Sequence, residues 1–490
     1  MATYFTNYTN SWSSERRDVL AQSLPSRDKK KRINSWSSER QRGYAACRVA
    51  SMALAALFVF TLSATAQSEH SGPWSLQDCT RYALEHNITL QQSGLSVQQR
   101  ENELAGAKAR MLPGVSASGN ESFSFGRGLT SDNTYANHSN TTMTSFSVGA
   151  QMPLFEGFTI KNNIALSRLN LEAATIDLEK ARDDIRVAVA QAYVQILYNK
   201  EILGVARNQI SVDSLQVVRL TTMLDAGKAS TAEVSAAEAT LAQSRLTVAQ
   251  AEGNLRIALL DLTQLLELTS PEGFDVVLPD VSFLEATDLA TPEAIYAEAM
   301  QVKPVIRSEQ LRLQAAEKNI DIARGGYYPS LSLSGGVGTN YYSIMGVEAP
   351  SFGSQLRDNF SPSLSLSLSF PIFDRFSTRT NVRAAKLSHM NQQLQLENAG
   401  KTLYKEIQQA YYNALTAKSK YESSMAAEKS ASAAFDIMSA KFENSKASIT
   451  EFNEAKNRLV SASSDLAQAR YQYLYQARLL DFYRGRDIVF

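Results

Sequence analysis

The chain has very few residues that could form a covalent cross-link or a metal site. It contains two cysteines and four histidines in 490 residues. Cys47 lies in a segment that we expect to be removed on export, so Cys79 would remain alone and could not form an internal disulfide. The histidines are scattered without the spacing of zinc ligands, so we expect no metal site.

Signatures of catalysis and of nucleic-acid binding are also missing. Lys plus Arg and Asp plus Glu balance at 49 each, and the chain after residue 66 is slightly acidic, which offers no basic face to a nucleic acid. The glycines form no phosphate loop before a helix, and no serine lies in a nucleophile elbow. We therefore expect no enzyme, no catalytic residue and no cofactor.

Long apolar runs are limited to one short stretch near the N-terminus. Arginines between residues 40 and 48 precede the apolar run 49–61, which is followed by the Ala-Thr-Ala sequence of residues 64–66. These are the three parts of a secretory signal, so we expect residues 1–66 to be an N-terminal extension and signal peptide; a retained anchor is the alternative. No later stretch approaches 18 uncharged apolar residues, so a membrane crossing would have to use strands.

The rest of the chain contains two copies of one unit. Residues 111–119 align with residues 327–335 at an offset of 216. At an offset of 218, Pro153-Leu154-Phe155 aligns with Pro371-Ile372-Phe373, Gln191-Ala192-Tyr193 with Gln409-Ala410-Tyr411, and Lys228-Ala229-Ser230 with Lys446-Ala447-Ser448. The expected domains are a first repeat at 67–268, a linker at 269–290, a second repeat at 291–485 and a short tail at 486–490.

Each copy predicts the same order of elements. These are a short helix (76–87 and 292–302), a second helix (89–111 and 304–326), a β-hairpin (about 113–155 and 329–373), a long helix (158–226 and 375–444) and a return helix (231–268 and 449–484). The long segments have no Pro, little Gly and much Ala, Leu, Gln, Lys and Glu. About 70 residues make a rod of about 100 Å, too long for an isolated globular helix, so we expect coiled-coil packing.

Strict alternation of apolar and polar residues predicts the strands. Leu364, Leu366, Leu368 and Phe370 alternate with serines, which is typical of a strand with one apolar and one polar face. Segments of about 10 such residues suit a transmembrane barrel, with polar loops at 127–143 and 340–359. Four strands cannot close a barrel, so several chains must associate; two would leave a filled interior, whereas three could leave a lumen.

Several short motifs accompany this order. They are Ser75-Leu76, Ala83-Leu84-Glu85-His86-Asn87, Ala226-Gly227-Lys228-Ala229-Ser230, Tyr328-Pro329-Ser330-Leu331, Phe370-Pro371-Ile372-Phe373 and Tyr471-Gln472-Tyr473-Leu474. Together with the duplication, they resemble the TolC-type outer membrane efflux protein family over about residues 74–485. No single motif is specific; the order and the duplication are.

The resemblance implies an α+β membrane channel built from a duplicated unit of long coiled-coil helices plus a β-hairpin. It implies a homotrimer whose twelve-strand β-barrel, in the lipid of the outer membrane, continues into a twelve-helix α-barrel across the periplasm of a Gram-negative bacterium. The function implied is a passive exit duct of a tripartite efflux pump or type I secretion system, with a periplasmic adaptor (membrane fusion) protein and an inner-membrane pump as partners. An exported periplasmic coiled-coil scaffold is the alternative.

The resemblance also implies that the turns between long and return helices dock the adaptor. The matching residues are Gly227, Lys228, Ser230, Ser445, Lys446 and Ser448. Gly227 stands where a helix C-terminus favours a positive φ. In the second copy Ser445 stands there instead, after Asn444, which can also adopt that conformation. The simpler alternative is that both segments are only reverse turns.

Three glutamates match family positions at the periplasmic gate: Glu451, Glu454 and Glu233. Glu451 and Glu454 are three residues apart, which places them on one face of the return helix. Three-fold symmetry would make each a ring of like charges that attracts cations. The alternative is that glutamates in the first turn of a helix simply interact favourably with the helix dipole.

Overall fold

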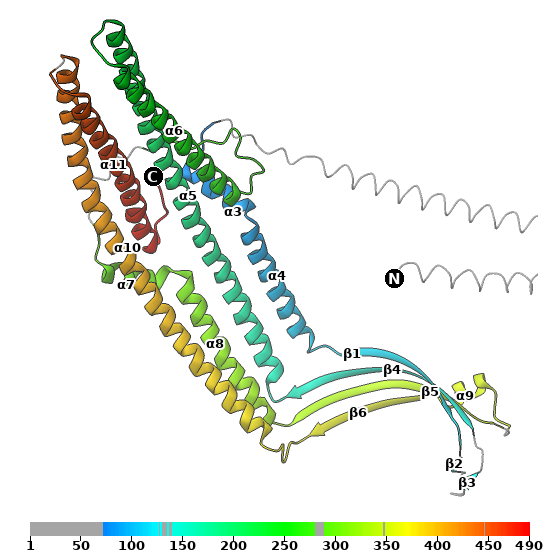
Figure 1. Ribbon diagram of the computed structural model, residues 1–490. Helices are drawn as coiled ribbons and strands as arrows, with labels where there is room; N and C mark the ends of the chain where they lie inside the picture. Colours follow the sequence, from blue (N-terminus) through cyan, green and yellow to red (C-terminus); the bar gives the residue numbers. More distant parts are fainter. Residues whose placement is uncertain are drawn as a thin grey trace, which may run out of the picture. The chain divides into compact units, whose positions relative to one another are not determined.

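The computed structural model describes residues 72–126, 128–129, 135–136, 140–279, 289–345, 348–444 and 446–490 (Figure 1). The chain divides into two units, Met1–Ser71 and Gly72–Phe490, and all described residues belong to the second. The expected signal peptide at 1–66, the Ser445 position and most of the loop at 127–143 therefore lie outside the described residues.

Two sets of helices and strands follow each other in the order expected from the repeats. The helices and strands that matter here are α3 (Leu76–His86), α4 (Ile88–Ala109), β1 (Gly114–Ser124), β4 (Thr141–Glu156), α5 (Thr159–Asp225), α6 (Thr231–Leu265), α7 (Pro292–Val302), α8 (Pro304–Arg324), β5 (Ser330–Ile344), α9 (Phe352–Asp358), β6 (Ser361–Ser369), α10 (Ser377–Glu443) and α11 (Ile449–Tyr483). Two short strands, β2 (Gly128–Leu129) and β3 (Tyr135–Ala136), pair with each other. The predicted helix boundaries are confirmed to within three residues.

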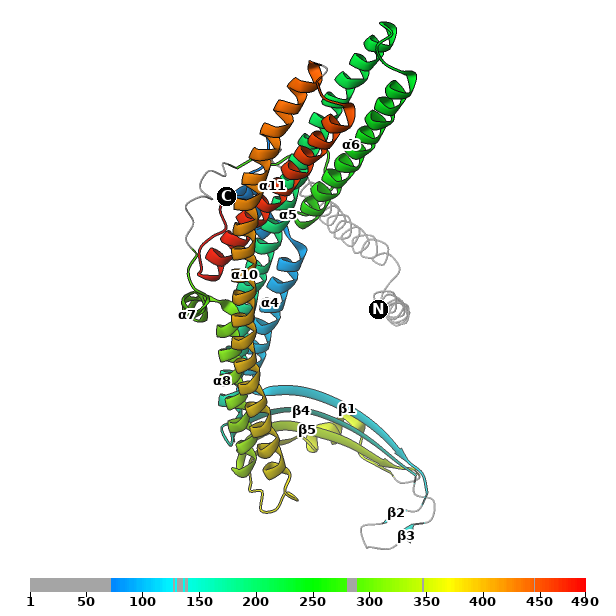
Figure 2. The ribbon, with the colours of Figure 1, turned by 60° about the vertical axis from the view of Figure 1, so that its left-hand side comes forward.

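The two long helices have the same length and the same kind of partner. α5 and α10 each span 67 residues, which corresponds to about 100 Å. α5 packs along α6 and α10 packs along α11, so each copy forms a long helical hairpin (Figure 1 and, in a turned view, Figure 2). Small residues such as Ala237, Ala414 and Ala417 are buried in these contacts, which lets the helices approach closely. No helix among the described residues is both long enough and apolar enough to qualify as a membrane span.

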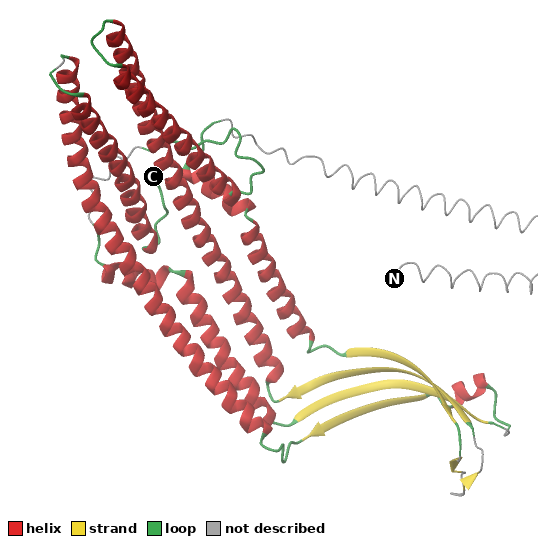
Figure 3. Ribbon diagram, in the orientation of Figure 1, coloured by secondary structure: helices red, strands yellow, loops and turns green. Residues whose placement is uncertain are grey.

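The four main strands form one antiparallel sheet in the order β1-β4-β5-β6, which Figure 3 shows in yellow. Its register places side chains of like polarity side by side. Val115 pairs with Ala150, which pairs with Gly335 and then Leu364. Leu333 pairs with Met152 on one side and with Leu366 on the other.

The rows on the other face of the sheet have the opposite character. Ser118 pairs with Ser147, which pairs with Gly338 and then Ser361. The sheet therefore has an apolar face and a face of serines and glycines, because successive side chains on a strand point to opposite sides. Both faces of β6 are exposed in the single chain.

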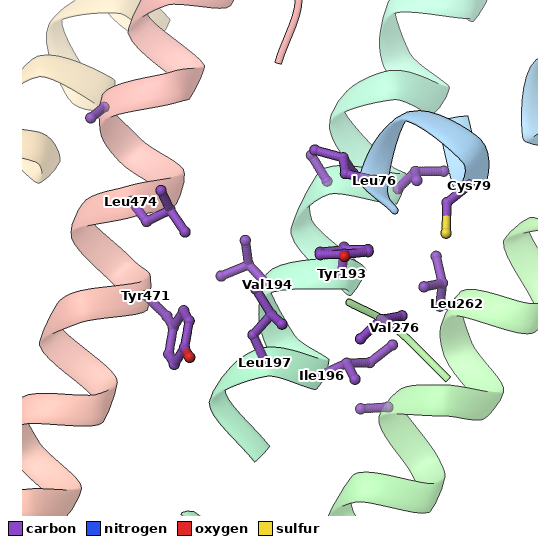
Figure 4. Close-up of a cluster of buried hydrophobic side chains, with 14 of the residues drawn as sticks. Leu76, Cys79, Tyr193, Val194, Ile196, Leu197, Leu262, Val276, Tyr471 and Leu474 are labelled. Carbon is purple, nitrogen blue, oxygen red and sulfur yellow. The ribbon is translucent and has the colours of Figure 1, made fainter. Parts of the chain in front are cut away.

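The core lies where the first short helix, the linker and both hairpins meet around α5 (Figure 4). Tyr193 on α5 is 2% exposed and donates its hydroxyl to Val277 O at 2.7 Å. Trp74 forms a parallel bridge with Val276 in the linker, with Trp74 N donating to Asp275 O at 2.8 Å. Leu474 of α11, fully buried, packs into the same cluster, so the second hairpin is anchored to the first.

The strand-to-helix junctions of the two copies share an uncommon backbone. Gly157 and Phe158 before α5, and Arg375 and Phe376 before α10, all have φ between 55° and 64°. Two successive left-handed residues turn the chain sharply, and for non-glycine residues this conformation is strained. A Cβ on Gly157 would lie 2.3 Å from Gly325 O, so only glycine fits at that position.

The segment expected as the polar loop 340–359 is more ordered than predicted. β5 continues to Ile344, beyond the level where β6 begins to pair at Gly338. In place of β6, the side chain of Gln355 on α9 accepts from Tyr342 N and donates to Tyr342 O, each at 3.0 Å. The side-chain amide thus pairs both backbone groups of Tyr342 on the free edge of β5, which the periodicity of the sequence could not reveal.

Candidate functional site: the helix tips

The first tip joins α5 to α6 through residues that were expected to dock a partner. Gly227 has φ 66°, and the Lys228 N–H donates to Met223 O at 2.8 Å, which closes the end of α5 as a Schellman turn. Space around Gly227 is open, so its role is the positive φ and not a close approach. Lys228 and Ser230 are exposed.

The second tip keeps the same closing bond with different residues. The Lys446 N–H donates to Lys441 O at 2.8 Å, as Lys228 does to Met223. Asn444 has φ −88°, so it does not supply the positive φ suggested for it; its side-chain amide donates to Ala440 O at 2.7 Å instead. Lys446 and Ser448 are exposed, as their counterparts in the first tip are.

Glu233 and Glu451 occupy equivalent positions, and each completes a capping box. The Ser230 N–H donates to Glu233 Oε2 at 2.7 Å and the Glu233 N–H donates to Ser230 Oγ at 3.2 Å. The Ser448–Glu451 pair has the same bonds at 2.8 and 3.2 Å. Hydrogen bonds from the serine N–H, and then from its hydroxyl, lower the pKa of both carboxyl groups below the ordinary value.

Two of the three residues expected at the gate, Glu233 and Glu451, therefore cap the helices on which they lie. A Ser-x-x-Glu sequence at the start of each return helix is the signal of a capping box, and it was readable from the sequence. Glu454 lies one turn further on and forms an exposed pair with Arg458, Nη2 to Oε1 at 2.6 Å. All three carboxylates remain exposed in the single chain.

Arg219 connects the two tips, which sequence reasoning did not predict. From the last turns of α5 its guanidinium donates to Phe442 O and Glu443 O at 2.9 and 3.0 Å and lies 4.6 Å from the Phe442 ring centre. These carbonyls belong to the C-terminal turn of α10, whose partial negative charge favours a cation. Arg219 therefore caps one hairpin from the other.

A buried ion pair joins the hairpins further from the tips. Lys456 of α11 and Asp213 of α5 are both 3% exposed, and Lys456 Nζ lies 2.5 Å from Asp213 Oδ1. The second carboxylate oxygen of Asp213 accepts from Ser244 Oγ of α6 at 2.5 Å and from Gln209 Nε2 at 2.9 Å. Three helices thus converge on one carboxylate, and the full hydrogen bonding compensates for its burial.

Removing the Arg219 side chain is expected to loosen the end of α10. In an Arg219→Ala variant, amide hydrogen exchange at residues 440–444 should accelerate about tenfold. A hydrogen bond from a charged donor contributes about 1.5–3 kcal/mol, and its loss makes local opening of the helix end correspondingly more frequent. Exchange in the first tip should change less. Unaltered exchange at 440–444 would show that Arg219 does not hold the α10 terminus.

Comparison with known proteins identifies the family. The sequence model described as "Outer membrane efflux protein" matches residues 80–267 and 295–486, which is most of the chain. The chain belongs to this family. The resemblance inferred from the motifs is thereby confirmed. The members of this family are outer membrane channels and not enzymes.

The chain is also similar to individual proteins of this family. The chain is 28% identical to Protein CyaE of Bordetella pertussis over 364 residues, covering 72% of this chain and 71% of that protein. It is 24% identical to outer membrane protein TolC of Vibrio cholerae over 291 residues, covering 58% of this chain and 64% of TolC. The crystal structure of the Campylobacter jejuni CmeC outer membrane channel superposes with a TM-score of 0.71 at 18% identity, over 84% of this chain and 86% of that one. The α+β channel fold is therefore confirmed.

Proposed function

We propose that three copies of this chain form an exit duct, which carries cargo from a periplasm-spanning pump through the outer membrane of a Gram-negative bacterium. The observation that carries the proposal is the open four-stranded sheet, whose outer strands β1 and β6 each have an unpaired edge. In hydrocarbon such edges must pair, so β6 of one copy would pair with β1 of the next. Twelve strands would leave a lumen that eight would not.

The two faces of the sheet support this placement. The apolar rows through Leu333 and Leu364 would contact lipid, and the rows of serine and glycine through Ser147 and Ser361 would line the lumen. The helical hairpins, with their charged exposed surfaces, would extend into the periplasm. An inner-membrane pump coupled through an adaptor would then select the cargo, which leaves drugs, metals, lipids and secreted proteins open.

The helix tips are the proposed docking surface for the periplasmic adaptor. Gly227→Pro should abolish efflux while trimers still form, because Pro cannot adopt the positive φ of the turn. Photo-crosslinking residues at positions 228 and 446 should capture the adaptor in intact cells. A matched control at Lys405, which is exposed on α10 far from the tip, should capture none. Crosslinks only to other copies of the chain would contradict docking at the tips.

We further propose that Glu451 and Glu454 line the periplasmic constriction. In a trimer, the Glu451→Ala, Glu454→Ala double variant should weaken block by divalent cations roughly tenfold, since facing rings of carboxylate bind cations that screen their repulsion. Single-channel recordings measure this block.

A second variant separates the gate from the capping role of Glu451. Ser448→Ala removes the hydroxyl half of the capping box and leaves both carboxylates in place. Its cation block should equal that of the wild type. Block that is weakened by Ser448→Ala as much as by the double variant would assign Glu451 to helix capping alone. Glu233, which has the equivalent capping position, is proposed to support the closed gate from the neighbouring tip.

A further inference from the structure

A stripe of unpaired cations begins where β6 passes into α10. Arg379, Arg383 and Lys386 follow at intervals of four and three residues, which places them on one face of the helix. All three are exposed, and Arg375 lies two residues before the helix begins. Within the described residues, none of these four side chains forms an ion pair or a hydrogen bond.

The stripe is separate from the face by which α10 packs. Thr378 is buried beside the Gly326 carbonyl, and Val382 and Ala385, at helical spacing from it, are half-buried. The acidic residue nearest in sequence, Asp374, accepts from the Thr378 N–H at 2.7 Å and so belongs to the start of the helix. No ion pair among the described residues therefore balances the positive charge of the stripe.

Large apolar side chains adjoin the stripe on its sheet side. Ile372 is 97% exposed and Phe373 is 71% exposed, and they lie a few residues beyond the end of β6, whose last outward leucine is Leu368. Phe376 packs edge-on against Phe373 at 5.6 Å and is itself mostly exposed. In water this arrangement would be unfavourable, whereas transmembrane barrels carry girdles of aromatic residues at both membrane interfaces.

The other strand-to-helix connections carry the same combination. Lys108 and Arg110 end α4 just before β1, next to the exposed Met111 and Leu112. Lys161 lies in the first turn of α5, after the exposed Phe158. Only α8 differs, because its Arg324 pairs with Asp321 at 3.2 Å. Cations without an ion pair among the described residues thus lie beside exposed apolar residues at three of the four connections.

We propose that this junction is a binding surface for anionic phospholipid headgroups of the leaflet on the helix side of the membrane. The inference rests on the proposed position of the sheet in the outer membrane. The apolar side chains would enter the acyl region, while the Lys and Arg side chains would extend their charged ends to the phosphates. Each cation near an anionic bilayer surface strengthens binding about fivefold. The partner is a lipid surface and not a protein, because the cations and exposed apolar side chains are spread over several connections between the sheet and the helices instead of lining one pocket.

The test uses a tryptophan at the junction and brominated lipids, which quench nearby indole fluorescence. Trimers carrying Phe376→Trp would be reconstituted in phosphatidylcholine vesicles containing a small fraction of brominated phosphatidylglycerol or, in parallel, of brominated phosphatidylcholine. The ratio of the two quenching efficiencies reports the local enrichment of anionic lipid. We expect several-fold enrichment that falls as salt is raised.

Charge-removal variants then locate the binding surface. Arg379→Gln, Arg383→Gln and Lys386→Gln together should abolish most of the enrichment, so that the ratio of the two quenching efficiencies approaches one. Arg379→Lys, Arg383→Lys and Lys386→Arg, which keep the positive charge, should retain the enrichment. The matched control Lys405→Gln, Lys420→Gln and Lys429→Gln removes three exposed cations from the same helix away from the junction and should also keep it.

Two results would overturn the inference while leaving the exit duct intact. One is equal quenching by both brominated lipids in trimers that insert and conduct ions. The other is unchanged enrichment in the junction variant together with altered ion selectivity of the pore, which would place the stripe on the lumen side. Trimers that neither insert nor conduct would instead contradict the proposed function itself.

Discussion

Replacing Lys456 by Met is expected to destabilise the helical region by about 3–5 kcal/mol. The substitution leaves the Asp213 carboxylate, 3% exposed, without its cation in the space between α5, α6 and α11. Breaking one half of a buried pair costs more than the pair contributes, because the remaining charge cannot be hydrated. The measurement is denaturant unfolding of the purified protein, followed by loss of helical circular dichroism.

Two further variants show whether the buried charge causes the loss. Adding Asp213→Asn to Lys456→Met should recover much of the stability, since Asn removes the charge and still offers an acceptor to Ser244. Lys401→Met, which breaks the exposed pair with Glu397, should change stability little. Equal losses from Lys456→Met and Lys401→Met would show that the α5–α11 contact does not depend on the ion pair.

Placing a charge on the apolar face of the sheet is the second change with a large expected effect. Leu366→Arg should cost about 2–4 kcal/mol for each chain and so reduce the yield of membrane-inserted trimer sharply. Leu366 pairs with Leu333, which pairs with Met152, so the new guanidinium would face hydrocarbon among apolar neighbours. The measurement is the amount of heat-dissociable trimer in outer-membrane fractions.

The neighbouring residue provides the matched control. Ser367 pairs with Ser332 on the opposite face, which we assign to the lumen, so Ser367→Arg should insert nearly as well as the wild type. If both arginines reduce insertion equally, the assigned faces of the sheet are wrong.

Sequence periodicity predicted the elements well because their causes are local. α5 ends at Asp225, just before the positive-φ Gly227, and α7 and α8 both begin at a proline, as the rules for helix ends require. The alternation of leucine and serine in β6 gave the strand and its two faces. The Ser-x-x-Glu capping boxes were equally local and could have been read from the sequence.

Contacts between distant parts of the chain could not be predicted in this way. Lys456 and Asp213 are 243 residues apart, and Arg219 meets α10 carbonyls 223 and 224 residues away. Nothing in the neighbourhood of these residues distinguishes them from other charges on long helices. Likewise, the side-chain amide of Gln355 can pair with Tyr342 because β6 pairs with β5 only as far as Gly338 and leaves the edge at Tyr342 free.

The most direct test of the exit duct is the conductance of the purified protein in planar lipid bilayers. Trimers are expected to insert spontaneously and to produce discrete current steps, with weaker cation block in the Glu451→Ala, Glu454→Ala variant. Trimers that insert into the bilayer but pass no current, or a protein that fractionates as a soluble periplasmic rod, would contradict the duct and favour a structural scaffold.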